Sequence, residues 1–443
     1  MRHRARGEAE CTRLLADTPT GSAASRPPPA PRVLVVAVRF PSPIQPWLLN
    51  QIVQVYRHGG SARIVARRAE GKGYPEIVDD LGLRENTLYL NVVPWTELIR
   101  GLLRPLATGP AGRAARQGLR TLLRSPYRPR GFKESIKAVA LAPVVAIEDV
   151  DVVHAHSLTY AYDYMHVSRI LGVPMVLTFH GHTTAGVATL AAPRRSILFE
   201  HIDAALVNTT FARTQLESLG CPSSKIRILP QGVRLSDYPF RPLPFPDSGP
   251  VRLLSVSRLQ PDKGLRYAID GVDLLLKRGY DVEYTVVGGG PEEEGLRTHI
   301  ETLGRADRIR LAGRVSDEKL RDLYGRAHVF ILPSLSNESD DHTETQGVVI
   351  QEAQASGLII TASRVGGIPE CVDEGRSAFL FPDRDPVAIA EVVAGVLDKP
   401  ELWSEWQEAG RRWVEDRFDI DRLGTILIEL YATIRAIRGN GAE

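Results

Sequence analysis

Short hydrophobic runs recur along the chain and alternate with longer amphipathic segments. The first run, Val33–Val38, is continuously apolar, which is typical of a strand buried on both faces, as in a parallel sheet. Similar runs follow at 62–66, 87–93, 152–156, 175–180, 204–208 and 226–230, and again at 251–257, 283–287, 308–312, 329–333, 358–362 and 379–381. This alternation predicts an α/β fold of doubly wound parallel sheets.

A proline-rich stretch separates the two series of runs. Residues 241–250 contain four prolines, which continue neither a helix nor a central strand. The chain is also longer than a single hydrophobic core usually grows, so we expect two Rossmann-like domains. The expected segments are a disordered leader (1–31), a first domain (32–240), a linker (241–250), a second domain (251–412) and a C-terminal helix packing back on the first domain (413–443).

Composition narrows the functional classes. Of 443 residues, 43% are hydrophobic and 24% are charged, and the formal net charge is +2. These values are ordinary for a globular protein and argue against a surface devoted to a polyanion. The three cysteines lie far apart, and no apolar run reaches the roughly 20 residues of a membrane-spanning helix. We therefore expect a cytoplasmic protein.

One segment, 98–133, is strongly basic. No acidic residue occurs between Glu97 and Glu134, while arginines and leucines interleave. Such a segment suits peripheral binding to the anionic inner face of a membrane, although a solvated helix pair explains it equally well. No aromatic stacking platform accompanies the charge, so we expect no nucleic-acid partner.

The second half carries cations and glycines where its strands end. Arg258 and Lys263 follow the first predicted strand, where a helix begins and where a planar fork and a point charge suit two adjacent phosphates. Gly288 ends the next strand and lets the backbone approach a ligand. Each feature alone also fits an ordinary surface turn.

Two glutamates provide the strongest signal. Glu344 and Glu352 are separated by seven residues, and Gly347 and Val348 open a predicted helix between them. Glu344 then lies on a loop and Glu352 about one turn inside the helix. Carboxylates at two depths suit two sets of sugar hydroxyls, and the helix N-terminus suits a diphosphate. An acidic first turn is the structural alternative.

Together these residues resemble glycosyltransferase family 4, and within it the exopolysaccharide or colanic-acid type. The resemblance rests on Arg258, Lys263, the Glu344–Glu352 spacing and Val365–Glu370, and it covers the chain from Arg32 onward. It implies a GT-B fold and retaining transfer. It also implies that Arg258 and Lys263 hold the diphosphate, Glu344 the donor sugar and Glu352 the ribose. Gly313 and Val315 would flank the base.

The resemblance places a further catalytic residue in the first half. His180, in a Thr-x-His-Gly turn, takes the position of a histidine beside the donor sugar, and we expect it to act as a hydrogen-bond donor in the transition state. The pairs His154/His156 and His180/His182 also match the spacing of a zinc chelate. No cysteine lies near them, and the family chemistry needs no metal, so we expect neither metal nor cofactor.

The acceptor-side residues follow the strand ends of the first half. They are Phe40, Gln45, Trp47, His156, Gly181 and His182. The loop containing Gln45 and Trp47 departs from the family pattern. The identity of the acceptor therefore remains open.

Asp149-Val-Asp151 spells the D-x-D motif of metal-dependent glycosyltransferases. It lies just before a buried strand, at the amino end, so we expect a structural role.

The sequence thus predicts transfer of a hexose from a UDP- or GDP-sugar to a glycan, a lipid-linked or a small-molecule acceptor. The alternatives are an epimerase or hydrolase of the same fold and an inactive partner protein. The sugar and the base are left open.

Overall fold

The computed structural model describes residues 30–42, 46–69, 76–89, 99, 103–124, 127, 131, 149–181, 190–336 and 343–440. The chain divides into two compact units. The first contains the described residues up to 180, then 190–229 and 424–440. The second contains residue 181 and residues 230–423.

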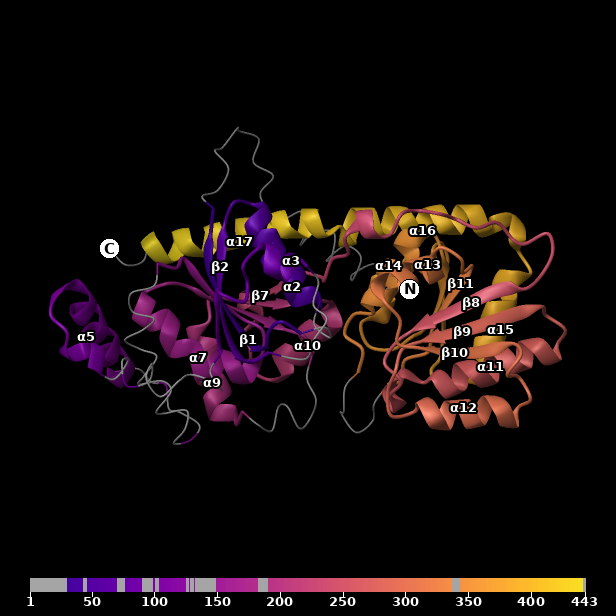
Figure 1. The fold of residues 1–443 in the computed structure, drawn as a ribbon, viewed down its shortest axis with the longest axis horizontal. Helices are drawn as coiled ribbons and strands as arrows, with labels where there is room; N and C mark the ends of the chain where they lie inside the picture. Colours follow the sequence, from indigo (N-terminus) through magenta and orange to yellow (C-terminus); the bar gives the residue numbers. More distant parts are fainter. Residues whose placement is uncertain are drawn as a thin grey trace. The chain divides into compact units, whose positions relative to one another are not determined.

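The first unit contains a parallel sheet of seven strands in the order β3-β2-β1-β4-β5-β6-β7. Strands β1 and β2 of this sheet are labelled in Figure 1. Its strands are β1 (Arg32–Arg39), β2 (Ser61–Arg68), β3 (Thr87–Tyr89), β4 (Val152–Ala155), β5 (Met175–Phe179), β6 (Ala204–Val207) and β7 (Ile226–Ile228). Its helices are α2 (Pro46–Arg57), α3 (Ile77–Asp80), α5 (Gly109–Arg124), α7 (Leu158–Leu171), α9 (Ala192–His201) and α10 (Thr210–Ser218), with short 3₁₀ turns at Arg104–Leu106 and Ser223–Lys225. Each predicted strand is present, which confirms the α/β pattern in this half.

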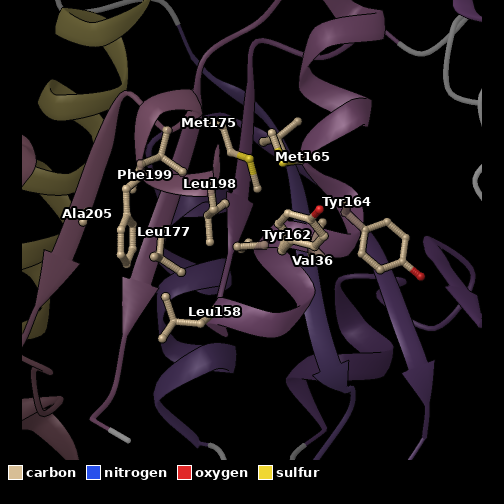
Figure 2. Close-up of a cluster of buried hydrophobic side chains, with 14 of the residues drawn as sticks. Val36, Leu158, Tyr162, Tyr164, Met165, Met175, Leu177, Leu198, Phe199 and Ala205 are labelled. Carbon is tan, nitrogen blue, oxygen red and sulfur yellow. The ribbon is translucent and has the colours of Figure 1, made fainter. Parts of the chain in front are cut away.

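Helices cover both faces of this sheet. The chain winds outward from β1 toward β3 and, separately, from β4 toward β7, and right-handed crossovers in opposite directions place their helices on opposite faces. The core on one face joins alternate strand residues, such as Val153 and Leu177, to α7 and α9. Figure 2 shows Leu177 with Tyr162, Met165 and Phe199 of this core. Because side chains alternate along a strand, His154 and Thr178 face the other side.

The second unit contains a parallel sheet of six strands in the order β10-β9-β8-β11-β12-β13. Its strands are β8 (Val251–Val256), β9 (Val282–Val287), β10 (Ile309–Gly313), β11 (Val329–Leu332), β12 (Ile359–Ser363) and β13 (Ala378–Phe381). Its helices are α11 (Leu265–Lys277), α12 (Glu293–Thr302), α13 (Asp317–Tyr324), α14 (Val348–Ser356), α15 (Pro386–Leu397) and α16 (Trp403–Phe418), with 3₁₀ turns at Leu235–Asp237, Pro261–Lys263, Ile368–Cys371 and Pro400–Leu402.

Both faces of the second sheet are also buried. Val329 and Ile331 pack with α11 and α15, while Phe330 and Leu332 pack with α14 on the opposite face. A strand buried on both sides explains the continuous apolar runs in the sequence.

The segment after β7 packs on the second unit before the predicted linker begins. The Val233 N–H donates to the Phe418 carbonyl at 2.8 Å, and the Arg241 N–H donates to the Ser356 carbonyl at 3.1 Å. The division between the units therefore falls at Leu229 and Pro230, earlier than residues 241–250.

The helical tail consists of α16 and α17 (Ile420–Asn440), which are separated at Asp419. From Gly424 onward, α17 belongs to the first unit, where the Tyr431 hydroxyl lies 2.6 Å from Nδ1 of His154 on β4. No helix within the described residues is both long and apolar enough to cross a membrane.

Candidate functional site

Lys263 and Glu344 form an ion pair in the second unit. Nζ of Lys263 lies 2.8 Å from Oε2 of Glu344 and 3.1 Å from a carboxylate oxygen of Asp262. Lys263 is only 6% exposed, and burial opposes its charge. The two carboxylates outweigh burial and raise the pKa of Lys263, so it remains a cation. The structure thus brings together two residues that stand 81 positions apart in the sequence.

A glycine turn holds the backbone of Glu344. The Gly367 N–H donates to the Glu344 carbonyl at 2.9 Å, while Gly366 has a φ of +54°. A Cβ at Gly366 would lie 2.1 Å from that same carbonyl oxygen, so no larger residue fits without moving Glu344. The predicted Val365–Glu370 motif therefore acts here as a support for the glutamate loop.

Arg258 lies at the exposed end of the turn after β8, and no ion pair to its side chain occurs among the residues that the structure describes. The Leu259 N–H donates to the Gly289 carbonyl at 3.2 Å, so this turn lies against the glycine turn after β9. A Cβ at Gly288 would lie 1.8 Å from the Ser257 carbonyl oxygen. Gly288 is therefore required by the neighbouring turn, whatever ligand it meets.

The end of β10 completes this rim of the sheet. The Gly288 N–H donates to the Gly313 carbonyl at 2.9 Å, and Gly313 and Val315 are both partly exposed. The strand ends carrying Arg258, Gly288 and Gly313 therefore lie on neighbouring strands, β8, β9 and β10.

Glu352 lies in the second turn of α14, which Gly347 precedes and Val348 begins, as the spacing predicts. The Tyr324 hydroxyl donates to Oε2 of Glu352 at 2.8 Å, and Tyr238 forms a second hydrogen bond to this carboxylate. Burial raises the pKa of Glu352, and the two hydroxyls only partly offset it.

Sequence reasoning missed these two tyrosines and also Gln346. The buried Gln346 amide donates to the Gln231 carbonyl and accepts from the Gln231 N–H, both at 2.8 Å. This pair ties the loop of Glu344 to the segment before β8. The adjacency of Gln346 to the Glu344 motif was the available signal, but its partner lies 115 positions away.

In the first unit, His154, His156 and His180 lie at the ends of β4 and β5. Ring centroids are 4.2 Å apart for His154 and His156 and 5.9 Å apart for His156 and His180, and the Trp47 ring lies 3.7 Å from His180. Burial lowers the pKa of His154 and of His180 to about 3. These imidazoles are therefore neutral at physiological pH.

The remaining acceptor-side predictions have different outcomes. Phe40 is only 1% exposed, so its side chain packs in the core instead of lining a surface. Gly181 follows His180 directly and has a φ of +90°. Gln45 and His182 lie outside the described residues.

The zinc interpretation finds no support at His154. Its Nδ1 lies 2.6 Å from the Tyr431 hydroxyl, and its Nε2 lies 2.7 Å from the Thr178 hydroxyl. Both ring nitrogens that could bind a metal are therefore already engaged in hydrogen bonds. Among the described residues, no group of three histidine, cysteine or acidic side chains is placed to hold a metal ion.

The D-x-D stretch has the structural role that its position predicted. Asp151 is 4% exposed and pairs with Arg32 at 2.9 Å and with Arg435 at 3.0 Å. Burial alone would raise its pKa, but the hydrogen bonds from Arg32 and the charges of both arginines hold the pKa of Asp151 below its usual value. Asp149 also pairs with Arg32.

Comparison with solved structures defines the class. The UDP complex of HepE from Anabaena superposes with a TM-score of 0.69 at 16% identity, covering 91% of this chain and all of that one. Sucrose-phosphate synthase from Thermosynechococcus elongatus gives 0.66 at 16% identity, over 92% of this chain and all of its own. The protein therefore has the GT-B fold, with two doubly wound parallel sheets.

Sequence comparison defines the family. The family models "Glycosyltransferase Family 4" and "Glycosyl transferases group 1" match residues 102–237 and 241–413. WcaL of Salmonella typhimurium, assigned to colanic acid biosynthesis as a glycosyltransferase, is 28% identical over 91% of this chain and all of its own length. The amylovoran biosynthesis glycosyltransferase AmsK of Erwinia amylovora is 30% identical, over 51% of this chain and 55% of its own. The chain belongs to glycosyltransferase family 4, and it is a glycosyltransferase.

Proposed function

We propose that this protein is a retaining hexosyltransferase that needs no metal. It transfers a hexose from a UDP- or GDP-sugar to a hydroxyl of a glycan, a glycolipid or a small molecule. The observation that carries this proposal is the buried Lys263–Glu344 ion pair, held by the Gly366–Gly367 turn. A solved relative in fold, HepE, binds UDP-glucose, and WcaL and AmsK are assigned to polysaccharide synthesis.

The ion pair supports diphosphate binding for a geometric reason. A lysine ammonium has three N–H donors, and two of them face Asp262 and Glu344. One donor is left for a phosphate oxygen, and Arg258 supplies a second cation from the adjacent turn. Both would stabilise negative charge on the leaving diphosphate.

The remaining residues are assigned by their positions. Glu344 orients the hexose hydroxyls, and Glu352, fixed by Tyr324, holds the ribose. Gly347 and Val348 present the N-terminus of α14 to the diphosphate. In the transfer step, the acceptor hydroxyl oxygen forms a bond to the anomeric carbon of the hexose. At the same time the bond between that carbon and the phosphate oxygen breaks, and the leaving phosphate takes the proton of the acceptor hydroxyl. His180 donates a hydrogen bond to the hexose.

The acceptor is proposed to be presented at the cytoplasmic face of a membrane. On α5, Leu123 is 74% exposed although its neighbour Leu122 is buried, and Leu106 in the preceding turn is 78% exposed. Arg113 and Arg120 are exposed on the same helix. Exposed leucines interspersed with arginines suit an anionic bilayer surface.

The function is tested with purified protein, EDTA and a panel of UDP-, GDP- and TDP-sugars. Release of nucleotide diphosphate is measured with and without membrane lipid extract. Release from one donor, accelerated by the extract, is expected. Glu344→Ala should lower the rate about 100- to 1,000-fold, since it removes an interaction with the reacting sugar. Glu391→Ala, an exposed glutamate on α15, should not change it.

Other outcomes separate the alternatives. Equal turnover without any acceptor would identify a hydrolase or epimerase. Nucleotide binding without release from any donor would identify an inactive partner protein. Turnover in a parallel reaction without EDTA, and its loss in the reaction with EDTA, would contradict metal independence.

A further inference from the structure

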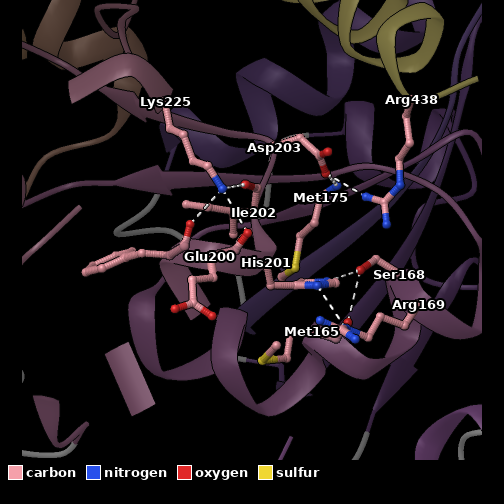
Figure 3. A network of polar contacts seen from close by, with 11 residues as sticks. Met165, Ser168, Arg169, Met175, Glu200, His201, Ile202, Asp203, Lys225 and Arg438 are labelled. Carbon is pink, nitrogen blue, oxygen red and sulfur yellow. Dashed lines mark hydrogen bonds and ion pairs between the residues drawn. The ribbon is translucent and has the colours of Figure 1, made fainter. Parts of the chain in front are cut away.

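A cavity of about 550 Å³ lies in the first unit, away from the residues assigned above. It is lined by Thr121, Arg124, Arg169, Glu200, His201, Asp203 and Arg438. Asp203 directly precedes β6, and its carboxylate accepts the N–H of Met175 at the start of β5 (Figure 3). The cavity is therefore at the amino edge of the sheet, whereas His156 and His180 follow the carboxyl ends.

Three guanidinium groups reach this cavity from elements far apart in the sequence. Arg124 ends α5, Arg169 lies in the last turn of α7, and Arg438 lies near the end of α17. Within the described residues, Arg124 makes no ion pair, and the hydrogen bond from Arg169 to His201 uses only the Nε of the arginine. Terminal N–H groups of both residues thus remain for a ligand.

A histidine fixes the orientation of Arg169. The Nε–H of Arg169 donates to Nδ1 of His201 at 3.1 Å, and Nε2 of His201 lies 2.6 Å from the Ser168 hydroxyl (Figure 3). That hydroxyl donates to the Met165 carbonyl, so Nε2 carries the proton and His201 is neutral. Burial and the neighbouring cations lower the pKa of His201 to about 3, which agrees with this assignment. The Arg169 side chain is therefore held in place by a neutral group, and no carboxylate neutralises its positive charge.

The acidic residues do not cancel this charge. Asp203 is already paired with Arg438 at 2.7 Å and with the Met175 N–H. Lys225 adds another cation near the cavity. Its ammonium donates to the carbonyls of Phe199, Glu200 and Ile202, which are neutral and leave its charge in place (Figure 3). The exposed Glu200 is the one carboxylate of the lining without a cation partner among the described residues.

We propose that this cavity is a binding site for a phosphate group, held by Arg124 and Arg169 and flanked by Arg438. Planar guanidinium forks match the oxygens of a phosphate, and guanidinium groups from three directions suit a tetrahedral anion better than a flat carboxylate. The site has room for more than a phosphate alone, which admits either a larger phosphorylated molecule or a lipid headgroup. Arg124 is the last residue of the basic helix α5. A soluble phosphorylated molecule and the headgroup of a lipid in a membrane surface bound by α5 could therefore both reach this site.

The test measures phosphate binding with the donor residues disabled. In an Arg258→Gln background, inorganic phosphate and pyrophosphate are titrated by calorimetry. Vesicles of phosphatidylglycerol in phosphatidylcholine are tested in parallel by co-sedimentation. Adding Arg124→Gln should weaken binding about tenfold, the loss of roughly one charge-assisted hydrogen-bonding pair. Arg120→Gln, an exposed arginine one turn earlier on the same helix, is the matched control.

The two arms identify the source of the phosphate. Binding of soluble phosphate that depends on Arg124 indicates a soluble phosphorylated ligand. Binding only to vesicles, weakened by Arg124→Gln more than by Arg120→Gln, indicates a headgroup. The proposal is overturned if soluble phosphate binds with the same affinity with and without Arg124→Gln. It is also overturned if soluble phosphate does not bind and both variants affect vesicle binding equally. Transferase turnover of the otherwise wild-type Arg124→Gln protein reports separately on the proposed function.

Discussion

At the scale of single residues, the proposed donor site consists of charged groups that contacts within the protein already hold in place. Lys263 is buried between two carboxylates, and Glu344 is tied to a glycine turn through its backbone. The Glu352 carboxylate accepts hydrogen bonds from the hydroxyls of Tyr324 and Tyr238. Side chains held in this way lose little freedom on binding, which favours tight recognition of the donor.

Replacing Gly366 with alanine should disable the enzyme. The new Cβ would lie 2.1 Å from the Glu344 carbonyl oxygen and force Glu344 to move. Gly375→Ala is the control, because Gly375 also has a positive φ, +84°, but no atom lies within 4 Å of its Cβ position. Both variants should lose about 1–2 kcal/mol of stability from backbone strain, while only Gly366→Ala loses turnover about 100-fold or more. Thermal unfolding and donor turnover are the measurements. Equal turnover in the two variants would contradict the assigned role of the turn.

Tyr324→Phe should weaken nucleotide binding. The change removes the hydroxyl that donates to Glu352 at 2.8 Å. The dissociation constant for the nucleotide diphosphate should rise about fivefold, equivalent to roughly 1 kcal/mol. Tyr284→Phe is matched, since that buried hydroxyl lies 2.6 Å from Ser255 and touches no assigned donor residue. If titration shows the same affinity loss in both variants, Tyr324 has no specific role in positioning Glu352.

At the scale of elements, the C-terminal helix and the first strands are joined by buried polar contacts. Asp151 precedes β4 and binds Arg32 at the start of β1 and Arg435 on α17. The Tyr431 hydroxyl of α17 contacts His154 on β4. The helix is thus attached to the first sheet by specific groups as well as by apolar packing.

Asp151→Asn should destabilise the protein without affecting turnover. The change weakens the hydrogen-bonded ion pairs of Asp151 with Arg32 and Arg435. Because these arginine side chains are themselves 39% and 47% exposed, we expect a loss of about 1–2 kcal/mol, which denaturant unfolding would detect. Asp149 is 81% exposed, so Asp149→Asn should change stability by less than about 0.5 kcal/mol. Turnover per folded molecule should stay unchanged in both variants. If Asp151→Asn is fully folded but has lost turnover, the result would instead support a metal-binding role for the D-x-D motif.

At the scale of the whole molecule, buried histidines make stability depend on pH. The pKa of His154, His180 and His201 is lowered to about 3 and that of His166 to about 4, in each case mainly by burial. In the unfolded chain, histidine titrates near 6.5. Below that pH the unfolded state binds more protons than the folded state, so this contribution to stability is complete above about 6.5 and is lost as the pH falls toward 4.

Acidification should therefore lower the melting temperature. Each buried histidine contributes up to about 1.4 kcal/mol per pH unit in this range. His166 packs between aromatic rings, so His166→Phe should reduce the pH dependence between 7 and 5. His58→Gln is the comparison, because His58 lies in the same unit and is only partly buried. A melting temperature that falls equally in wild type and His166→Phe would show that His166 does not contribute.

The sequence predicted the central strands well because a strand that is buried on both faces reads as a continuous apolar run. Val33–Val38 and Val329–Leu332 are examples, and both fall within observed strands. It also predicted the position of Glu352 in α14, since helical spacing is local. The role of Phe40 was harder to predict, because its burial depends on how the first turn folds onto the core.

By itself, the sequence determined the two-sheet architecture, the family and the strand ends that carry the candidate site residues, since these follow from local periodicity and motif spacing. Only the tertiary structure decided which groups meet. Lys263 reaches Glu344 across 81 positions, Gln346 reaches Gln231 across 115, and Arg124, Arg169 and Arg438 line one cavity. The physical reason is that parallel sheets place residues from distant strands and helices side by side, and that pairing leaves no local pattern in the chain.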